Sequence, residues 1–176
     1  MRDLLFNRDG LMLGICNGFQ ALVKLGLVPY GDIRPMDDEC PTLTFNTIGR
    51  HQSRLVRTRV ASNLSPWLSQ CEPGDIHTVA ISHGEGRFVC SPELQHQLEV
   101  TGRIATQYVD EAGQPSMDWG VNPNGSVMAI EGITSPDGRV LGKMGHVERR
   151  GDGLYKNVPG NKFMPLFESG VKYFTD

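Results

Sequence analysis

Apolar residues in this chain occur in short runs that are separated by turn residues. The first run, residues 11–16, is almost entirely apolar, which is typical of a strand buried on both faces of a sheet. Asn17 and Gly18 break this run, and a segment of mixed apolar and polar residues continues to Gly26. Because Pro29 prevents a helix from extending much further, the pattern predicts a strand, a sharp turn and a helix.

The rest of the pattern predicts further strands and two further helices. Ser91 and Pro92 suit the cap and first turn of a helix over 91–100, and apolar residues near helical spacing predict another helix over 162–174. No repeat, low-complexity tract or linker divides the chain, so we expect one domain over 1–176 of the α/β class. The further strands are expected at 42–46, 54–61, 77–83, 104–109, 126–133 and 140–144.

Composition and charge exclude several classes of protein. Gly and Pro contribute 21 and 11 of the 176 residues, which favours a turn-rich fold over a helical bundle. The formal net charge of −3 gives no basic field for nucleic acid or anionic lipid. No apolar stretch approaches the ~18 residues of a membrane span, and charges occur too early for a signal peptide, so we expect a cytoplasmic protein. The four cysteines lack zinc-site and redox-pair spacing, and no metal site is predicted.

The sharpest chemical signal is the pentapeptide at residues 14–18, in which Cys16 stands between Gly14 and Gly18. A nucleophile flanked by glycines at a strand-to-helix turn is typical of a nucleophile elbow, whose central side chain is exposed on a strained backbone. The following amide, that of Asn17, would then point to where an oxyanion forms. The pentapeptide alone is also compatible with a structural turn around a small buried cysteine.

A thiol nucleophile needs a base, and the base needs a partner that orients it. His146 is followed two positions later by Glu148, and in extended backbone such residues project to the same side. The pair follows the predicted strand at 140–144, so it can meet Cys16 where open α/β sheets place their active sites. By itself, a His-x-Glu sequence is also compatible with a solvated surface pair.

A third cluster, residues 82–88, combines two glycines with an imidazole, a carboxylate and a guanidinium. These residues follow a predicted strand and suit a loop whose backbone approaches a polar substrate. The composition is equally that of a glycine-rich turn with a surface Glu–Arg pair. The residues concerned are His83, Gly84, Glu85 and Arg87.

Together these segments resemble the triad-type glutamine amidotransferase domains, and most closely the C-terminal glutaminase region of phosphoribosylformylglycinamidine synthase. The order and spacing of the motifs match that family across nearly the whole chain. The resemblance implies the flavodoxin-like amidotransferase fold, an open, mostly parallel twisted sheet with flanking helices and a nucleophile elbow. The matching segments are 13–20, 82–88, 122–126, 138–142 and 146–149.

The resemblance implies a role for each of these residues. Cys16 is the nucleophile that attacks the side-chain amide of glutamine, His146 protonates the departing ammonia and then activates water, and Glu148 orients His146. The Asn17 amide helps to hold the oxyanion. Substrate contacts, or contacts at the seam with a synthetase, are implied for Gly14, Asn17, Gln20, His83, Gly84, Glu85 and Arg87.

The resemblance also implies a partner that consumes the ammonia. In the family, a synthetase domain or subunit of the same enzyme uses ATP and Mg²⁺ to convert formylglycinamide ribonucleotide to the amidine in de novo purine biosynthesis. This chain is accordingly expected to bind glutamine and to need no cofactor of its own.

Two departures from the family pattern matter. The family usually has proline on both sides of the catalytic histidine, where this chain has Gly145 and Val147, and glycine is expected to loosen the segment that aims His146. Cys16 also lies close to Met1, so we expect a domain without its N-terminal part and an apolar strand at 11–15 with an unpaired edge. Such an edge predicts self-association.

Two alternatives to a working glutaminase remain at this point. The fold can persist as a binding or interaction module in which the chemistry has been lost with part of the oxyanion hole. The elbow can also belong to another cysteine hydrolase of similar topology, such as a peptidase.

Overall fold

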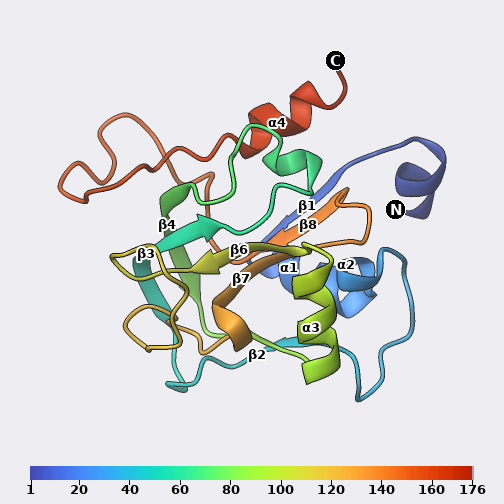
Figure 1. Ribbon diagram of the computed structural model, residues 1–176, viewed down its shortest axis with the longest axis horizontal. Coiled ribbons are helices and arrows are strands. Elements are labelled where there is room, and N and C mark those ends of the chain that lie inside the picture. The colour runs from blue at the N-terminus through green and yellow to red at the C-terminus, as the bar shows by residue number, and fades with distance from the viewer. Residues whose placement is uncertain (176) are drawn as a thin grey trace.

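The computed structural model describes residues 1–175 and contains a six-stranded sheet (Figure 1). The strand order is β1-β8-β7-β6-β3-β4, and a separate pair, β2 with β5, forms a small antiparallel ribbon. All the predicted strands are present, within a few residues of their expected bounds. The strands are β1 (Met12–Ile15), β2 (Thr42–Thr44), β3 (Gln52–Val60), β4 (Ile76–His83), β5 (Arg87–Val89), β6 (Ile104–Tyr108), β7 (Ile130–Thr134) and β8 (Val140–Lys143).

The sheet is mixed, and this corrects one part of the expected fold. The α/β class with flanking helices is confirmed, but only β1 and β8 pair in parallel, whereas the other four strand contacts are antiparallel. The expectation of a mostly parallel sheet is therefore wrong for this chain. The physical reason lies in the connections: a parallel pair needs a long crossover, whereas the short turn at 135–139 reverses the chain directly from β7 into β8.

Helices cover both faces of the sheet. One core cluster joins α1, α2 and α3 to one face, through residues such as Phe19, Leu98 and Ile133. The second cluster packs Leu68 and Leu166 against the other face, and Figure 1 shows α4 on the opposite side of the sheet from α3. The helices are α1 (Asn17–Leu25), α2 (Leu27–Tyr30), α3 (Pro92–Val100) and α4 (Leu166–Lys172), with single turns at Asp3–Asn7, Pro66–Leu68 and Val127–Ala129.

Capping residues and proline determine where two of the helices begin. Ser91 caps α3 by accepting a hydrogen bond from the Leu94 amide, as the sequence predicts. The last helix is shorter than expected, because Pro165 stands at its N-cap position and the chain before it is irregular. None of the helices that the structure describes is both long and apolar enough to cross a membrane.

Strand β1 forms one edge of the sheet. The amides of Met12 and Cys16 donate to carbonyls of the β8 segment, so the alternating amides of Leu13 and Ile15 face away from β8. Within residues 1–175, no other strand pairs with β1. The expectation of an unpaired edge at this strand is confirmed.

Candidate active site

Cys16 occupies a sharp turn between β1 and α1. Its backbone has φ 54° and ψ −108°, a conformation that side-chain-bearing residues rarely adopt. Gly14 makes the turn possible, because a Cβ there would lie 2.5 Å from Leu22 Cδ1 and 2.7 Å from the Gly18 backbone. The predicted nucleophile-elbow conformation is confirmed, and the thiol is presented where β1 ends.

The surroundings of Cys16 shift the pKa of its thiol upward. Burial raises the pKa of the Cys16 thiol, and the amide of Asn17 and the charge of Arg149 oppose this shift, while Glu148 adds to it. The thiol donates a hydrogen bond to the Ser82 carbonyl oxygen, with Sγ and O separated by 3.7 Å. A neighbouring base that accepts the thiol proton would therefore assist any reaction of Cys16 as a nucleophile.

His146 follows β8, the strand that runs parallel to β1, so both chemical groups lie at the carboxyl ends of neighbouring strands. Its amide donates to the Ala80 carbonyl at 2.8 Å, and its Nδ1 lies 2.5 Å from Glu148 Oε1. The Nε2 atom is buried and has no hydrogen-bond partner among the described residues. With Nδ1 occupied by the carboxylate, Nε2 is the nitrogen left to exchange a proton.

The glycine-rich loop lies against the first turns of α1. Gln20 donates through Nε2 to the Glu85 carbonyl at 2.5 Å, so the structure brings these two predicted contact residues together. Arg87 belongs to β5, and its Nε is buried without a hydrogen-bond partner in the described part of the chain. The loop is thus fixed close to the elbow, as expected of a segment that borders the site.

Asn46 organises this loop, although no motif in the sequence singles it out. Its backbone amide donates to the Gly84 carbonyl at 2.9 Å, and its side-chain Oδ1 accepts from the Gly86 backbone amide at 3.1 Å. The same oxygen lies 3.2 Å from Nδ1 of His83, whose ring is only 4% exposed. The His83 imidazole is therefore part of the loop's internal support. Its position at the end of the predicted strand 42–46 is the only signal that could have singled out Asn46.

His83 gives a pH dependence that can be measured. Burial, followed by the nearby His51, lowers the pKa of His83 to about 4, so between about pH 4 and 6.5 the unfolded chain binds a proton that the folded chain does not. Stability therefore rises with pH in this window, and acidification to pH 4 costs roughly 3 kcal/mol from this group. Urea unfolding across pH 4–7 should show the slope, and His83→Gln should flatten it.

The matched control for this measurement is His96→Gln, which changes an exposed histidine on α3. It is expected to retain the parent's slope. Equal slopes for the parent and for His83→Gln would contradict the assignment to His83.

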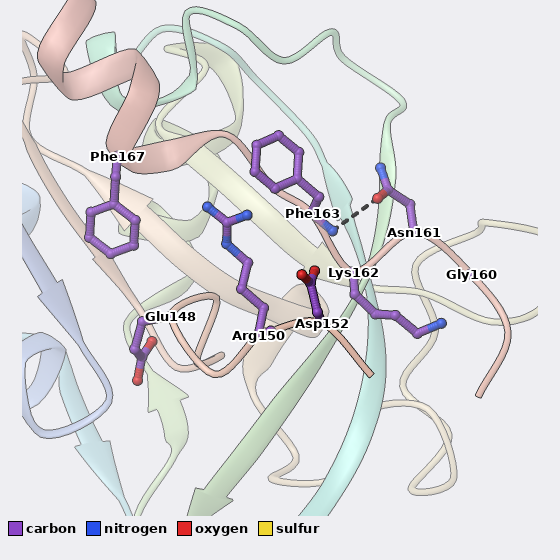
Figure 2. Close-up of a pocket in the computed structure, with 9 residues that line it drawn as sticks. Glu148, Arg150, Asp152, Gly160, Asn161, Lys162, Phe163 and Phe167 are labelled. Carbon is purple, nitrogen blue, oxygen red and sulfur yellow. Dashed lines mark hydrogen bonds between the residues drawn. The ribbon is translucent and has the colours of Figure 1, made fainter. Parts of the chain in front are cut away.

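An open cavity of about 620 Å³ adjoins the Glu148 side of the site. Figure 2 shows the Arg150 guanidinium between the rings of Phe163 and Phe167, and its Cζ lies 4.2 Å from the centre of the Phe163 ring. Arg150 also pairs with Glu168 at 3.0 Å. The cavity contains charges of both signs, and among the residues described no cluster of His, Cys, Asp and Glu could hold a metal ion.

Comparisons with known proteins identify the family to which this chain belongs. Residues 1–174 match the CobB/CobQ-like glutamine amidotransferase domain. Phosphoribosylformylglycinamidine synthase subunit PurQ from Synechococcus sp. (strain JA-2-3B'a(2-13)) is 36% identical over 95% of this chain and 64% of its own length. The corresponding subunit from Symbiobacterium thermophilum is 34% identical over 96% of this chain and 65% of its own length.

A solved structure, PurLQS from Thermotoga maritima, matches 96% of this chain and 64% of its own chain, with a TM-score of 0.68 and 27% identity. The chain thus spans slightly less than two thirds of the length of these relatives. The resemblance inferred from the sequence motifs is confirmed over nearly all of its residues. This chain belongs to the CobB/CobQ-like glutamine amidotransferase domain family.

Proposed function

We propose that this chain hydrolyses the side-chain amide of glutamine and delivers the ammonia to an ATP-dependent synthetase that makes formylglycinamidine ribonucleotide in purine biosynthesis. One observation carries the proposal: Cys16 on its strained turn and the His146–Glu148 pair occupy the carboxyl ends of two parallel neighbouring strands. The names of the PurQ relatives support the choice of pathway.

The chemistry begins with proton transfer from Cys16 Sγ to Nε2 of His146. The resulting thiolate attacks the amide carbon of glutamine, and the negative charge that develops on the amide oxygen is stabilised by the Asn17 amide. His146 returns the proton to the departing nitrogen, so ammonia leaves and a γ-glutamyl thioester remains on Cys16. His146 then takes a proton from water, whose oxygen attacks the thioester, and glutamate leaves as the thiol is restored.

Glu148 gives His146 the correct tautomer for both halves of the reaction. When Nδ1–H donates to Glu148 Oε1, Nε2 carries the lone pair that accepts the thiol proton. The same carboxylate stabilises the imidazolium that forms after transfer. Because burial raises the pKa of the Cys16 thiol, transfer of its proton to a neighbouring base favours formation of the thiolate.

The partner in this proposal is a synthetase domain or subunit that binds ATP and Mg²⁺, while the chain itself uses no cofactor. The PurLQS structure that resembles this chain supports such a partner. We propose a cytoplasmic location, where purine precursors are made. Gln20 and the loop at 84–86 would lie along the substrate pocket or the seam with the synthetase, because they border the elbow.

Incubation with glutamine, together with a reactive diazoketone analogue of glutamine, tests the function. We expect release of ammonia and glutamate in equal amounts, and a covalent adduct at Cys16 identified by peptide mass spectrometry. An adduct without turnover would identify an impaired site that only binds glutamine. Neither turnover nor adduct, in the presence of the synthetase as well, would contradict the proposal and favour an interaction module.

The unpaired edge of β1 predicts concentration-dependent self-association. Sedimentation velocity should show the mean mass rising with protein concentration, because outward-facing amides and carbonyls of Leu13 and Ile15 can pair with another strand. Leu11→Lys, next to this edge, should shift the association to higher concentration. Val100→Lys adds the same charge at a site that is 64% exposed on α3 and serves as the control. A mass that stays monomeric at all concentrations would contradict the prediction.

A further inference from the structure

A fully buried ion pair lies beneath the segment that carries His146. Glu131 on β7 and Lys143 on β8 have no exposed side-chain surface, and Lys143 Nζ lies 3.0 Å from Glu131 Oε1. Removing two charges from water is costly, and the attraction between them offsets this cost only if further hydrogen bonds satisfy both groups. The remaining partners of the pair therefore indicate what it does.

Those partners converge on Gly145, the residue before His146. The Gly145 amide donates to Glu131 Oε1, and the Gly145 carbonyl accepts from Lys143 Nζ at 3.1 Å. The second carboxylate oxygen of Glu131 accepts from the Thr106 hydroxyl, which fixes the orientation of the carboxylate. Each side chain of the ion pair thus binds one of the two polar backbone groups of a single residue.

The absence of a side chain at position 145 allows this contact. A Cβ there would lie 2.8 Å from Glu131 Oε1 and 2.7 Å from Val79 Cγ2, so a larger residue would displace the carboxylate from the backbone. Glycine at this position was expected to loosen the aim of His146. In the structure, it instead permits the ion pair to bind the backbone directly.

We infer that Glu131 and Lys143 are positioning residues for His146, and that this buried ion pair holds the His146 peptide in the geometry needed for proton exchange with Cys16. The inference rests on the proposed function for the role of His146. The Gly145 carbonyl carbon is bonded to the nitrogen of His146, so a shift of Gly145 moves the imidazole directly. A displacement of about 1 Å in such a group can lower a catalytic rate roughly 10²-fold.

The test replaces both charges together, so that neither is left buried alone. Glu131→Leu/Lys143→Met removes every side-chain bond to Gly145, and we expect kcat for glutamine to fall roughly 10²-fold with KM nearly unchanged. Glu131→Gln/Lys143→Met keeps an oxygen that accepts from the Gly145 amide, and it should recover at least about tenfold of that loss. The control Arg2→Met/Asp32→Leu removes an exposed ion pair and should behave as the parent.

The pH profile of Cys16 alkylation provides a readout that does not require turnover. Loss of positioning should move the alkylation midpoint toward higher pH in Glu131→Leu/Lys143→Met and leave it in place in the control. If the parent shows no glutamine hydrolysis but the profiles still separate, the proposed function fails while the positioning role stands. A folded Glu131→Leu/Lys143→Met protein with the parent's kcat and alkylation profile would overturn the inference.

A milder variant covers the case in which Glu131→Leu/Lys143→Met does not fold. Thr106→Val removes only the hydroxyl that orients the Glu131 carboxylate, and it preserves the shape of the side chain. We expect its alkylation midpoint to move in the same direction by a smaller amount. A folded Thr106→Val protein with the parent's profile would then count against the role of Glu131.

Discussion

Cys16→Ala should abolish glutamine hydrolysis, with kcat falling by at least about 10³-fold, because no other group in the site can form the thioester. The variant should still fold, since the thiol's polar contact is a single long hydrogen bond to Ser82. Ammonia release in a coupled assay measures the rate, and equilibrium binding of glutamine separates lost chemistry from lost affinity. We expect glutamine to bind Cys16→Ala about as tightly as it binds the parent.

Cys40→Ser is the matched control for this experiment. Cys40 is half-buried and lies in the loop before β2, outside the segments assigned to the site, so the variant should hydrolyse glutamine at the parent's rate. In the labelling experiment with the diazoketone analogue of glutamine, Cys71 and Cys90 are expected to form no adduct, because burial raises the pKa of both thiols to about 11. Residual hydrolysis by Cys16→Ala above a few per cent of the parent rate would show that Cys16 is not the nucleophile.

Lys143→Met should lower the free energy of unfolding by about 3–5 kcal/mol, because it leaves the Glu131 carboxylate buried without its counter-charge. Glu131→Leu/Lys143→Met should recover part of that loss, since apolar residues of similar volume replace both charges while the Gly145 backbone groups and the Thr106 hydroxyl lose their partners. Urea unfolding followed by tryptophan fluorescence gives both values. The two single substitutions and the pair form a cycle that isolates the interaction energy of the two side chains.

Comparison with an exposed ion pair shows whether the Glu131–Lys143 pair contributes as a buried pair should. Arg2→Met, which breaks an exposed ion pair, should change the free energy of unfolding little, because such pairs contribute about 0–1 kcal/mol. If Lys143→Met is no more destabilising than Arg2→Met, the pair is not the buried network that the structure describes.

Local sequence patterns predicted the elements that depend on local physics. The strand at 11–16, the turn at Cys16 and the helix capped by Ser91 follow from run length, glycine placement and capping chemistry, and each is present. The final helix was expected to be longer than it is, since the spacing of its apolar residues continues through Pro165 into a segment without helical hydrogen bonds.

Pairing between distant segments was harder to predict. The expectation of a mostly parallel sheet came from the resemblance to the amidotransferase family, and the one parallel contact in the sheet joins β1 to β8. The orientation of β3, β4, β6 and β7 depends on how their connections return across the sheet, which hydrophobic alternation does not encode. The sequence motifs predict that Cys16, His146 and Glu148 form one site. The structure pairs β1 with β8 and joins His146 to Glu148, and the chemical roles of these residues stay predictions.

The Glu131–Lys143 pair could not be recognised from the sequence. Each residue is the only charged residue of its strand, and the two are 12 positions apart. Only the pairing of β7 with β8 brings them together, and only their common contact with Gly145 connects them to His146. Asn46 escaped notice for the same reason, since it binds Gly84 and His83, which lie in a distant segment.

The backbone conformation at Cys16 lowers the stability of the fold while it presents the thiol proposed to react with glutamine. A non-glycine residue held at φ 54° costs about 1–3 kcal/mol, and glycine would adopt the same conformation at little cost. If variants of this protein were selected for thermal stability alone, replacement of Cys16 by glycine would therefore be favoured. Persistence of cysteine at this turn in such a selection would indicate that its chemistry, rather than the durability of the fold, is what the organism retains.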